Sequence, residues 1–193
     1  MILVIDTSSA LSAVALLDAS GVVLREKTYT SGKGFDLPAA FRSFDVREPL
    51  SKVAVATGPG SFTGLRVGVS FGLGLAMGLR IPIVPLSTLG IQAARSDRPV
   101  TAVAEAGRGR VYFQAHGLDA TLGEPSELPA AWPVVGWLRP STLAEMGVAG
   151  RDMVSDSELV SFGEAARRVL KSAREVAYGS VKIAYMQSFS PKA

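Results

Sequence analysis

TGPGSFTGLRVG, at residues 57–68, is the stretch that most restricts the fold of this 193-residue chain. The apolar run 53–57 before it predicts a buried strand, and the largely apolar run 63–79 predicts a helix. The glycines allow a tight turn, and Ser61 or Thr63 can cap the helix, whose free N–H groups bind anions. The stretch therefore predicts a strand–turn–helix unit with an anion site, or a tight turn alone. It lacks the Gly-Lys-Ser/Thr ending of a P-loop.

The predicted helix carries a repeated set of small residues. Gly64, Gly68, Gly72 and Ala76 recur every four residues and form one stripe. Each glycine inside a helix costs about 1 kcal/mol relative to alanine, so close packing must offset that cost. Most other positions are large and apolar, and a helix that is apolar all round is buried all round. We therefore expect a second protein molecule to cover it; burial by the chain's own second lobe or first helix is the alternative.

Arg66 is the only charged residue in this predicted helix before Arg80. It lies near the helix N-terminus, where the helix dipole disfavours a cation. An acidic partner or a bound anion would explain its position, and so would a solvated side chain.

The rest of the first half predicts a mixed sheet with short helices. Short apolar or alternating runs predict strands at 2–5, 11–18, 22–30 and 83–86. Leu37, Phe41 and Phe44 have helical spacing, and another helix is expected from about residue 88 to residue 95.

Asp6, Thr7 and Ser8 directly follow the first predicted strand. A carboxylate and hydroxyl groups at the end of a strand can hold a hydrated metal or a phosphate. The same residue types also cap turns, so the sequence leaves both interpretations open.

The second half begins after a change in composition near residues 96–99. Strands are predicted at 100–104, 110–116 and 134–135, within an otherwise irregular 117–140 segment. Ser155 and Glu158 are spaced as a capping box before an amphipathic helix, and a last strand is expected from Val181. The chain is thus predicted to form two lobes, at residues 1–98 and 99–193.

Composition excludes several classes of protein. With 48% hydrophobic and 19% charged residues, the chain is too apolar for a disordered segment. It has no cysteine and a single histidine, His116, so thiolate chemistry and zinc sites built on several histidines are excluded. A net charge of +3 permits contact with nucleic acid without requiring it. The apolar stretch 67–79 is predicted to be too short to cross a membrane, so we expect a soluble, cytoplasmic protein.

Three segments together resemble one family: 2–8 (ILVIDTS), the opening stretch 57–68, and 85–89 (PLSTL). Their order and spacing are similar to those of the TsaB (YeaZ) family, and 109–112 (GRVY) resembles its next motif. The resemblance implies an α/β fold of the actin, sugar-kinase and Hsp70 type. Such a fold has two lobes of related, ribonuclease H-like βββαβα design, with the second lobe reduced here.

The resemblance also implies a role in making threonylcarbamoyladenosine next to the anticodon of tRNAs. TsaB proteins pair with the catalytic TsaD, work with the ATPase TsaE, and are regarded as non-catalytic scaffolds and activators. We thus expect a heterodimer with TsaD, a homodimer in isolation, indirect contact with tRNA and no membrane contact. We expect no cofactor in this chain, and ATP or ADP and a metal on the partner subunits. The catalytic relatives hold their metal with a pair of histidines, which one histidine cannot reproduce.

In the family, the first two helices bind the partner subunit. The residues expected at this interface are Leu37, Phe41, Thr63, Gly64, Arg66, Val67, Gly68, Phe71, Gly72 and Leu75. The candidate anion or nucleotide site comprises Asp6, Thr7, Ser8, Gly58, Gly60 and Ser61, and no catalytic residue or metal ligand is expected. Glu105-Ala106-Gly107 stands where the family has Asp-Ala-Arg, which weakens the case for a nucleotide site. The alternatives are an ATP-dependent phosphotransferase or ATPase of the same fold and, last, a glycoprotease-like peptidase.

Overall fold

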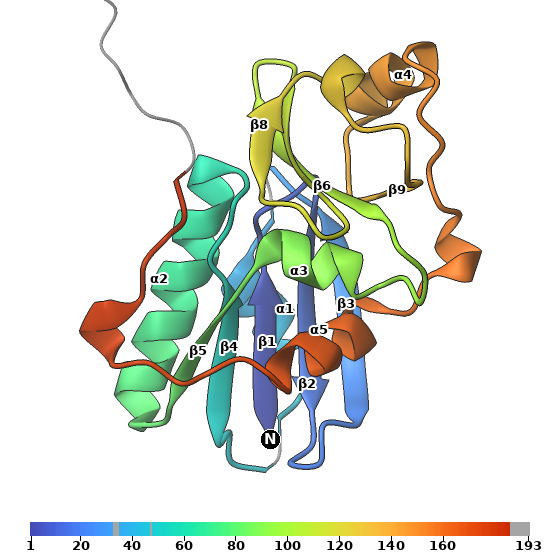
Figure 1. The fold of residues 1–193 in the computed structure, drawn as a ribbon. Coiled ribbons are helices and arrows are strands. Elements are labelled where there is room, and N and C mark those ends of the chain that lie inside the picture. The colour runs from blue at the N-terminus through green and yellow to red at the C-terminus, as the bar shows by residue number, and fades with distance from the viewer. Residues whose placement is uncertain (33–34, 47, 186–193) are drawn as a thin grey trace, which may run out of the picture.

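The computed structural model describes residues 1–32, 35–46 and 48–185, and it contains two β-sheets (Figure 1). The first sheet consists of β1 (Ile2–Asp6), β2 (Leu11–Leu17), β3 (Val23–Thr30), β4 (Lys52–Ala56) and β5 (Ile83–Leu86). The second consists of β6 (Thr101–Gly107), β7 (Arg110–Ala115), β8 (Thr121–Gly123) and β9 (Val134–Val135). The helices are α1 (Leu37–Arg42), α2 (Phe62–Leu79), α3 (Thr88–Ala93), α4 (Pro140–Val148) and α5 (Phe162–Leu170). Short 3₁₀ turns lie at Pro125–Glu127, Asp156–Glu158 and Tyr178–Ser180.

The first sheet has the strand order β3-β2-β1-β4-β5. β1 pairs antiparallel with β2 and parallel with β4, so the first sheet combines an antiparallel meander with a parallel crossover connection. Leu3, Val4 and Ile5 are at most 1% exposed, as expected of a strand covered on both faces.

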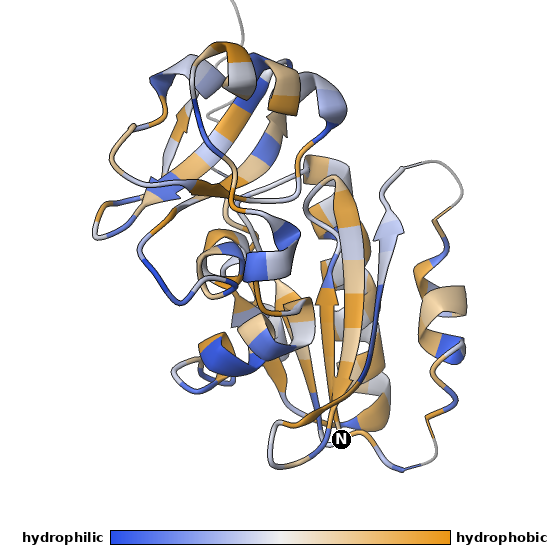
Figure 2. Ribbon diagram, turned by 90° about the vertical axis from the view of Figure 1, so that its right-hand side faces the viewer, coloured by the Kyte–Doolittle hydropathy of each residue, from blue (hydrophilic) through white to orange (hydrophobic). Residues whose placement is uncertain are grey.

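Alternate side chains of β1 enter two different cores. Leu3 and Ile5 pack in a cluster with residues of α1 and α2, whereas Val4 packs with residues of α3 and α5 on the opposite face. Figure 2 shows the hydrophobic strands in the middle of this layer. The first sheet is therefore sandwiched between two layers of helices.

The second sheet repeats the first in reduced form. Its order, β8-β7-β6-β9, has the same sequence of antiparallel, antiparallel and parallel pairings as β3-β2-β1-β4. Its outer strands have only three and two residues. Met146 of α4 packs with Val103 and Phe113 of this sheet, so α4 covers one of its faces. Two lobes of related design, the second reduced, are thus observed.

The predicted boundary at residue 98 needs one correction. The second sheet does follow it, but α5 returns to the first sheet, where Phe162, Ala165 and Ala166 pack against Val4 and Ala15. The apolar side of α5 is buried by the face of the first sheet opposite α2. Residues 99–193 therefore do not all belong to the second lobe.

Other local expectations were also wrong. The 3₁₀ turn Asp156–Glu158 replaces the predicted helix start at Ser155. The Ser155 side chain makes no capping hydrogen bond, and Glu158 forms an ion pair with Arg98 at 2.8 Å. The cap of α5 is Ser161, whose Oγ accepts a hydrogen bond from the backbone of Glu164 at 3.3 Å. α4 begins at Pro140 and was not predicted, although proline suits the first turn of a helix. The described part of the expected last strand, residues 181–185, is irregular, and Met186 onwards lies outside the described residues.

α2 is long and apolar enough, by length and composition, to cross a membrane. The expectation that the stretch was too short was wrong, because the helix begins at Phe62 and has 18 residues. Its inner side packs on the first sheet, as in the core helix of an α/β fold.

Candidate functional site

The inner side of α2 lies directly on the first sheet, and the glycine stripe makes this approach possible. A methyl group added at Gly68 would overlap Oγ1 of Thr7, and one at Gly72 would overlap Cγ1 of Val55. Ala76, the last member of the stripe, is fully buried. The stripe therefore packs against the chain's own sheet and not, as predicted, against a partner.

Several residues predicted at the partner interface are consequently inaccessible. Gly68, Gly72 and Leu37 are buried, and a methyl group at Gly64 would overlap the carbonyl oxygen of Thr7. Leu37 enters the core because α1 packs on the same face of the sheet as α2. The sequence pattern correctly indicated close packing but misidentified the surface that receives it.

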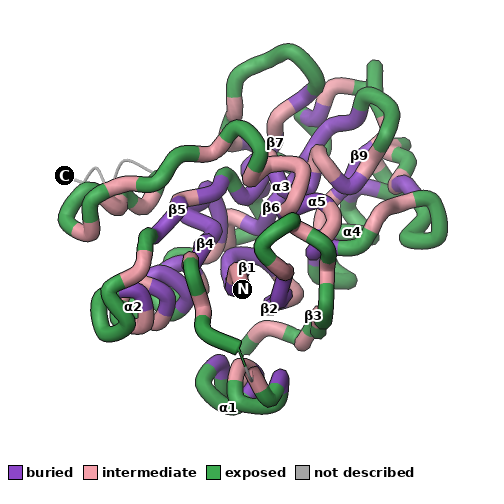
Figure 3. The backbone as a smooth tube through the Cα atoms, turned by 90° about the horizontal axis from the view of Figure 1, so that it is seen from below, coloured by how far each residue is buried: buried purple, intermediate pink, exposed green. Residues whose placement is uncertain are grey.

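The outer side of α2 is not covered by any of the described residues. The exposed residues of this helix are Phe62, Thr63, Arg66, Val67, Ser70, Gly74, Met77, Gly78 and Leu79. Val67 is 44% exposed and Met77 52% exposed, and a methyl group at Gly74 or Gly78 would meet nothing within 4 Å. Figure 3 shows the helix buried toward the sheet and exposed on its far side. We call this surface, Thr63, Val67, Ser70, Gly74, Met77 and Gly78, the outer face.

Two different elements flank the outer face. On one flank, Phe71 contacts Phe41 of α1 with ring centroids 6.0 Å apart, and Leu75 is half-buried. On the other, the C-terminal segment runs beside α2 (Figure 1), where the Tyr178 hydroxyl donates to the carbonyl oxygens of Ala76 and Ile81.

Tyr185 and Phe62 end this second flank, with ring centroids 5.3 Å apart. Sequence reasoning missed the C-terminal segment as part of this surface, because its contacts with α2 join residues about a hundred positions apart.

The predicted anion site at Asp6 is closed. Asp6 is fully buried, and its Oδ1 accepts hydrogen bonds from Ser8 N at 2.8 Å and Ser8 Oγ at 2.5 Å. Oδ2 is buried and has no hydrogen-bond partner within the described part of the chain. Burial raises the pKa of Asp6 above its ordinary value, against the opposing effect of the Ser8 hydrogen bonds. Burial therefore disfavours the charged form of Asp6, and its carboxyl group is not exposed to solvent.

The glycine turn closes this site. The backbone N–H of Ser61 donates to the carbonyl oxygen of Ser8 at 2.7 Å, and a side chain at Gly60 would collide with the same oxygen. Thr7 Oγ1 donates to the carbonyl oxygen of Gly64 at 2.6 Å, and Ser61 Oγ caps α2. The six predicted residues are thus brought together, except that Gly58 lies against the C-terminal segment at Ala184. Their polar groups largely bind one another.

A cavity of about 800 Å³ lies next to this turn, between the lobes. Its lining includes Thr7, Ser61 and Thr63 from the first lobe and Glu105 from the second. Glu105 lies two residues before the end of β6, whereas Asp6 is the last residue of β1. The Oε1 of Glu105 accepts a hydrogen bond from the backbone N–H of Arg139 at 2.7 Å. Asp6 and Glu105 are therefore each hydrogen-bonded within their own lobe.

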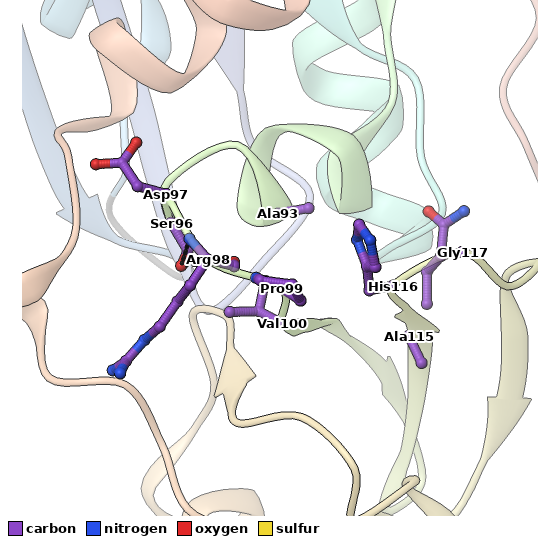
Figure 4. A pocket seen from close by; sticks show the side chains of 10 residues that line it. Ala93, Ser96, Asp97, Arg98, Pro99, Val100, Ala115, His116 and Gly117 are labelled. Carbon is purple, nitrogen blue, oxygen red and sulfur yellow. Dashed lines mark hydrogen bonds between the residues drawn. The ribbon is translucent and has the colours of Figure 1, made fainter.

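A smaller cavity of about 400 Å³ lies in the second half of the chain, beside the end of α3 (Figure 4). His116 lines it, and Figure 4 shows Asp97 and Arg98 pointing away from the imidazole. His116 packs edge-on against Trp132, with ring centroids 6.0 Å apart. Among the described residues, no three His, Cys, Asp or Glu side chains gather in a way that could hold a metal ion.

Comparisons with known proteins agree with these features. The family model of TsaD, tRNA N6-adenosine threonylcarbamoyltransferase, matches residues 38–127. The chain is 37% identical over 120 residues to the "tRNA threonylcarbamoyladenosine biosynthesis protein TsaB" of Bacillus subtilis, a match that covers 58% of this chain and 52% of that protein. The protein of the same name from Escherichia coli is 36% identical over 75 residues, covering 36% of this chain and 32% of its own length. The chain thus matches about half, or less, of the length of these relatives.

The fold itself matches over nearly the whole chain. The solved structure of YeaZ from Pseudomonas aeruginosa superposes with a TM-score of 0.72 at 21% identity, covering 96% of this chain and 99% of that one. Sequence relatives that share the name TsaB and a solved YeaZ structure with the same fold thus agree with the resemblance seen in the sequence.

Proposed function

We propose that this chain acts in the biosynthesis of threonylcarbamoyladenosine on tRNA, as a non-catalytic subunit that binds the catalytic TsaD. The observation that carries the proposal is the uncovered outer face of α2. Val67 and Met77 present apolar surface there, and the open space at Gly74 and Gly78 would let another helix approach closely. In this arrangement TsaE joins the complex, and tRNA is reached through the partner subunits in the cytoplasm.

The hydrogen bonding of the Asp6 and Glu105 carboxyl groups supports a role without catalysis. A phosphotransferase of this fold needs carboxylates free to hold a metal–nucleotide complex and a base for the acceptor. Here Asp6 is sealed by Ser8 and the glycine turn, and Glu105 is bound to the backbone of Arg139. We infer that ATP or ADP and the metal belong to the partner subunits, and that this chain turns over no ATP by itself.

Reconstitution with TsaD, TsaE and the enzyme that supplies threonylcarbamoyl-adenylate tests this proposal. We expect this chain to co-purify with TsaD, and modified tRNA to form only when this chain is present. The isolated chain should form a homodimer through the same face and release no phosphate from ATP. Full tRNA modification without the chain, or steady phosphate release by the chain alone that disappears in Asp6→Ala, would contradict the proposal.

A further inference from the structure

One charged side chain beside the outer face is held in place by aromatic residues, with no counter-ion among the described residues. The Arg66 guanidinium lies over the Phe62 ring, 3.7 Å from its centroid, and Nε donates to the Tyr185 hydroxyl at 3.3 Å. Its two terminal nitrogens make no hydrogen bond or ion pair with any described residue. The aromatic contacts orient the group, so little side-chain entropy remains to be lost when it binds an anion.

The sequence on either side of Arg66 is poor in acidic residues. The sequence has no Asp or Glu between Glu48 and Asp97, and Arg80 is exposed at the far end of α2. The helix dipole adds positive potential at the N-terminal end, where Arg66 lies. With 1.5 Å of rise per residue, the two arginines stand about 20 Å apart at the ends of one apolar face.

We infer that the partner helix seated on the outer face carries a carboxylate that binds Arg66, with a second acidic group near Arg80. This inference rests on the proposed function and specifies the chemistry of the partner surface. A second copy of this chain fits less well, because its own α2 would present only arginines. Its α1 carries Asp36, but that residue caps α1, on the flank of α2 opposite Arg66. A nucleic-acid backbone fits less well too, since α2 has one cation in 18 residues and an apolar outer face.

The test is the affinity of the purified chain for TsaD at low and high salt. Arg66→Gln should weaken binding about tenfold at low salt and reduce the salt dependence, because one charge-assisted contact is lost. Arg66→Glu should weaken binding further, since it places two carboxylates together. Arg174→Gln removes the same charge from an exposed position beyond α5 and should leave affinity unchanged. Tyr185→Phe, which keeps the ring and the charge, should bind nearly as wild type.

The inference would be overturned if Arg66→Gln bound TsaD with wild-type affinity and salt dependence while Gly74→Leu lost binding. That result would leave the docking proposal intact. No binding of the wild-type chain to TsaD would overturn both. Unchanged TsaD affinity combined with weaker self-association, or with weaker tRNA binding, would assign Arg66 to a second copy or to RNA and would overturn the inference as well.

Discussion

The two sides of α2 use glycine for different purposes. On the inner side, Gly68 and Gly72 lie where any side chain would overlap Thr7 or Val55, so the sheet itself requires them. On the outer side, Gly74 and Gly78 have open space around them, so nothing within the folded chain requires them. Glycine costs about 1 kcal/mol inside a helix on either side. The comparison indicates that the inner glycines serve the fold, whereas the outer ones have the open space that the proposed docking of a partner would use.

The largest effect is expected on the inner side. Gly72→Leu would force the new side chain into the first sheet beside Val53 and Val55, which are fully buried. Because a sheet cannot shift without disturbing its neighbours, we expect a loss of about 3 kcal/mol or more in the free energy of unfolding. Urea denaturation followed by circular dichroism measures it. A Gly72→Leu protein as stable as wild type would contradict the close packing described above.

The matched substitution on the outer side should behave in the opposite way. Gly74→Leu meets no neighbouring atom within 4 Å and replaces a poor helix former by a good one. We therefore expect the free energy of unfolding to be unchanged or to rise by up to about 1 kcal/mol. Affinity for TsaD should fall at least about tenfold, because the leucine occupies the space through which a partner helix approaches. Calorimetric titration of TsaD measures this fall, and unchanged affinity would exclude this face as the docking surface.

The contrast also shows how far the sequence predicts this molecule. Continuous apolar runs were enough to place β1 and β4, and the helix expected at 63–79 is observed as Phe62–Leu79. Periodicity also identified the stripe of Gly64, Gly68 and Gly72. It did not identify the neighbour, because a sheet and a partner helix both accept small residues in the same way.

Prediction of the candidate site was limited because the site depends on tertiary contacts that residue types do not reveal. Asp6, Thr7 and Ser8 were correctly located at the end of a strand, but only the fold shows that the turn at Gly60 closes over them. The flank formed by Tyr178 and Tyr185 depends on pairings between distant parts of the chain, which local patterns do not encode.

The smallest expected effect is the contribution of Asp6 to the pH dependence of stability. Asp6 lies near the N-terminal end of α2, on the side that faces the sheet. Because its pKa is raised in the folded protein, the folded state binds the Asp6 proton more tightly than the unfolded state does. Its contribution to stability is therefore most favourable below the unfolded pKa, and it declines as the pH rises toward the folded value. A carboxyl group whose pKa is lowered on folding contributes stability that is lost as the pH falls. Arg167 lowers the pKa of Glu164 to about 2, so the contribution of Glu164 changes only at acidic pH.

Asp6→Asn isolates this contribution. The amide keeps an oxygen that can accept from Ser8 but has no proton to lose. We expect the stability of wild type relative to Asp6→Asn to fall as the pH is raised from the ordinary aspartate pKa through the raised pKa of the folded protein, measured by urea denaturation at several pH values. Because other titrating groups are common to both proteins, their effects cancel in this difference. If the stabilities of the two proteins changed in parallel with pH, Asp6 would have the same pKa in the folded and unfolded chains. The closed site near the N-terminus of α2 would then have to be open to solvent.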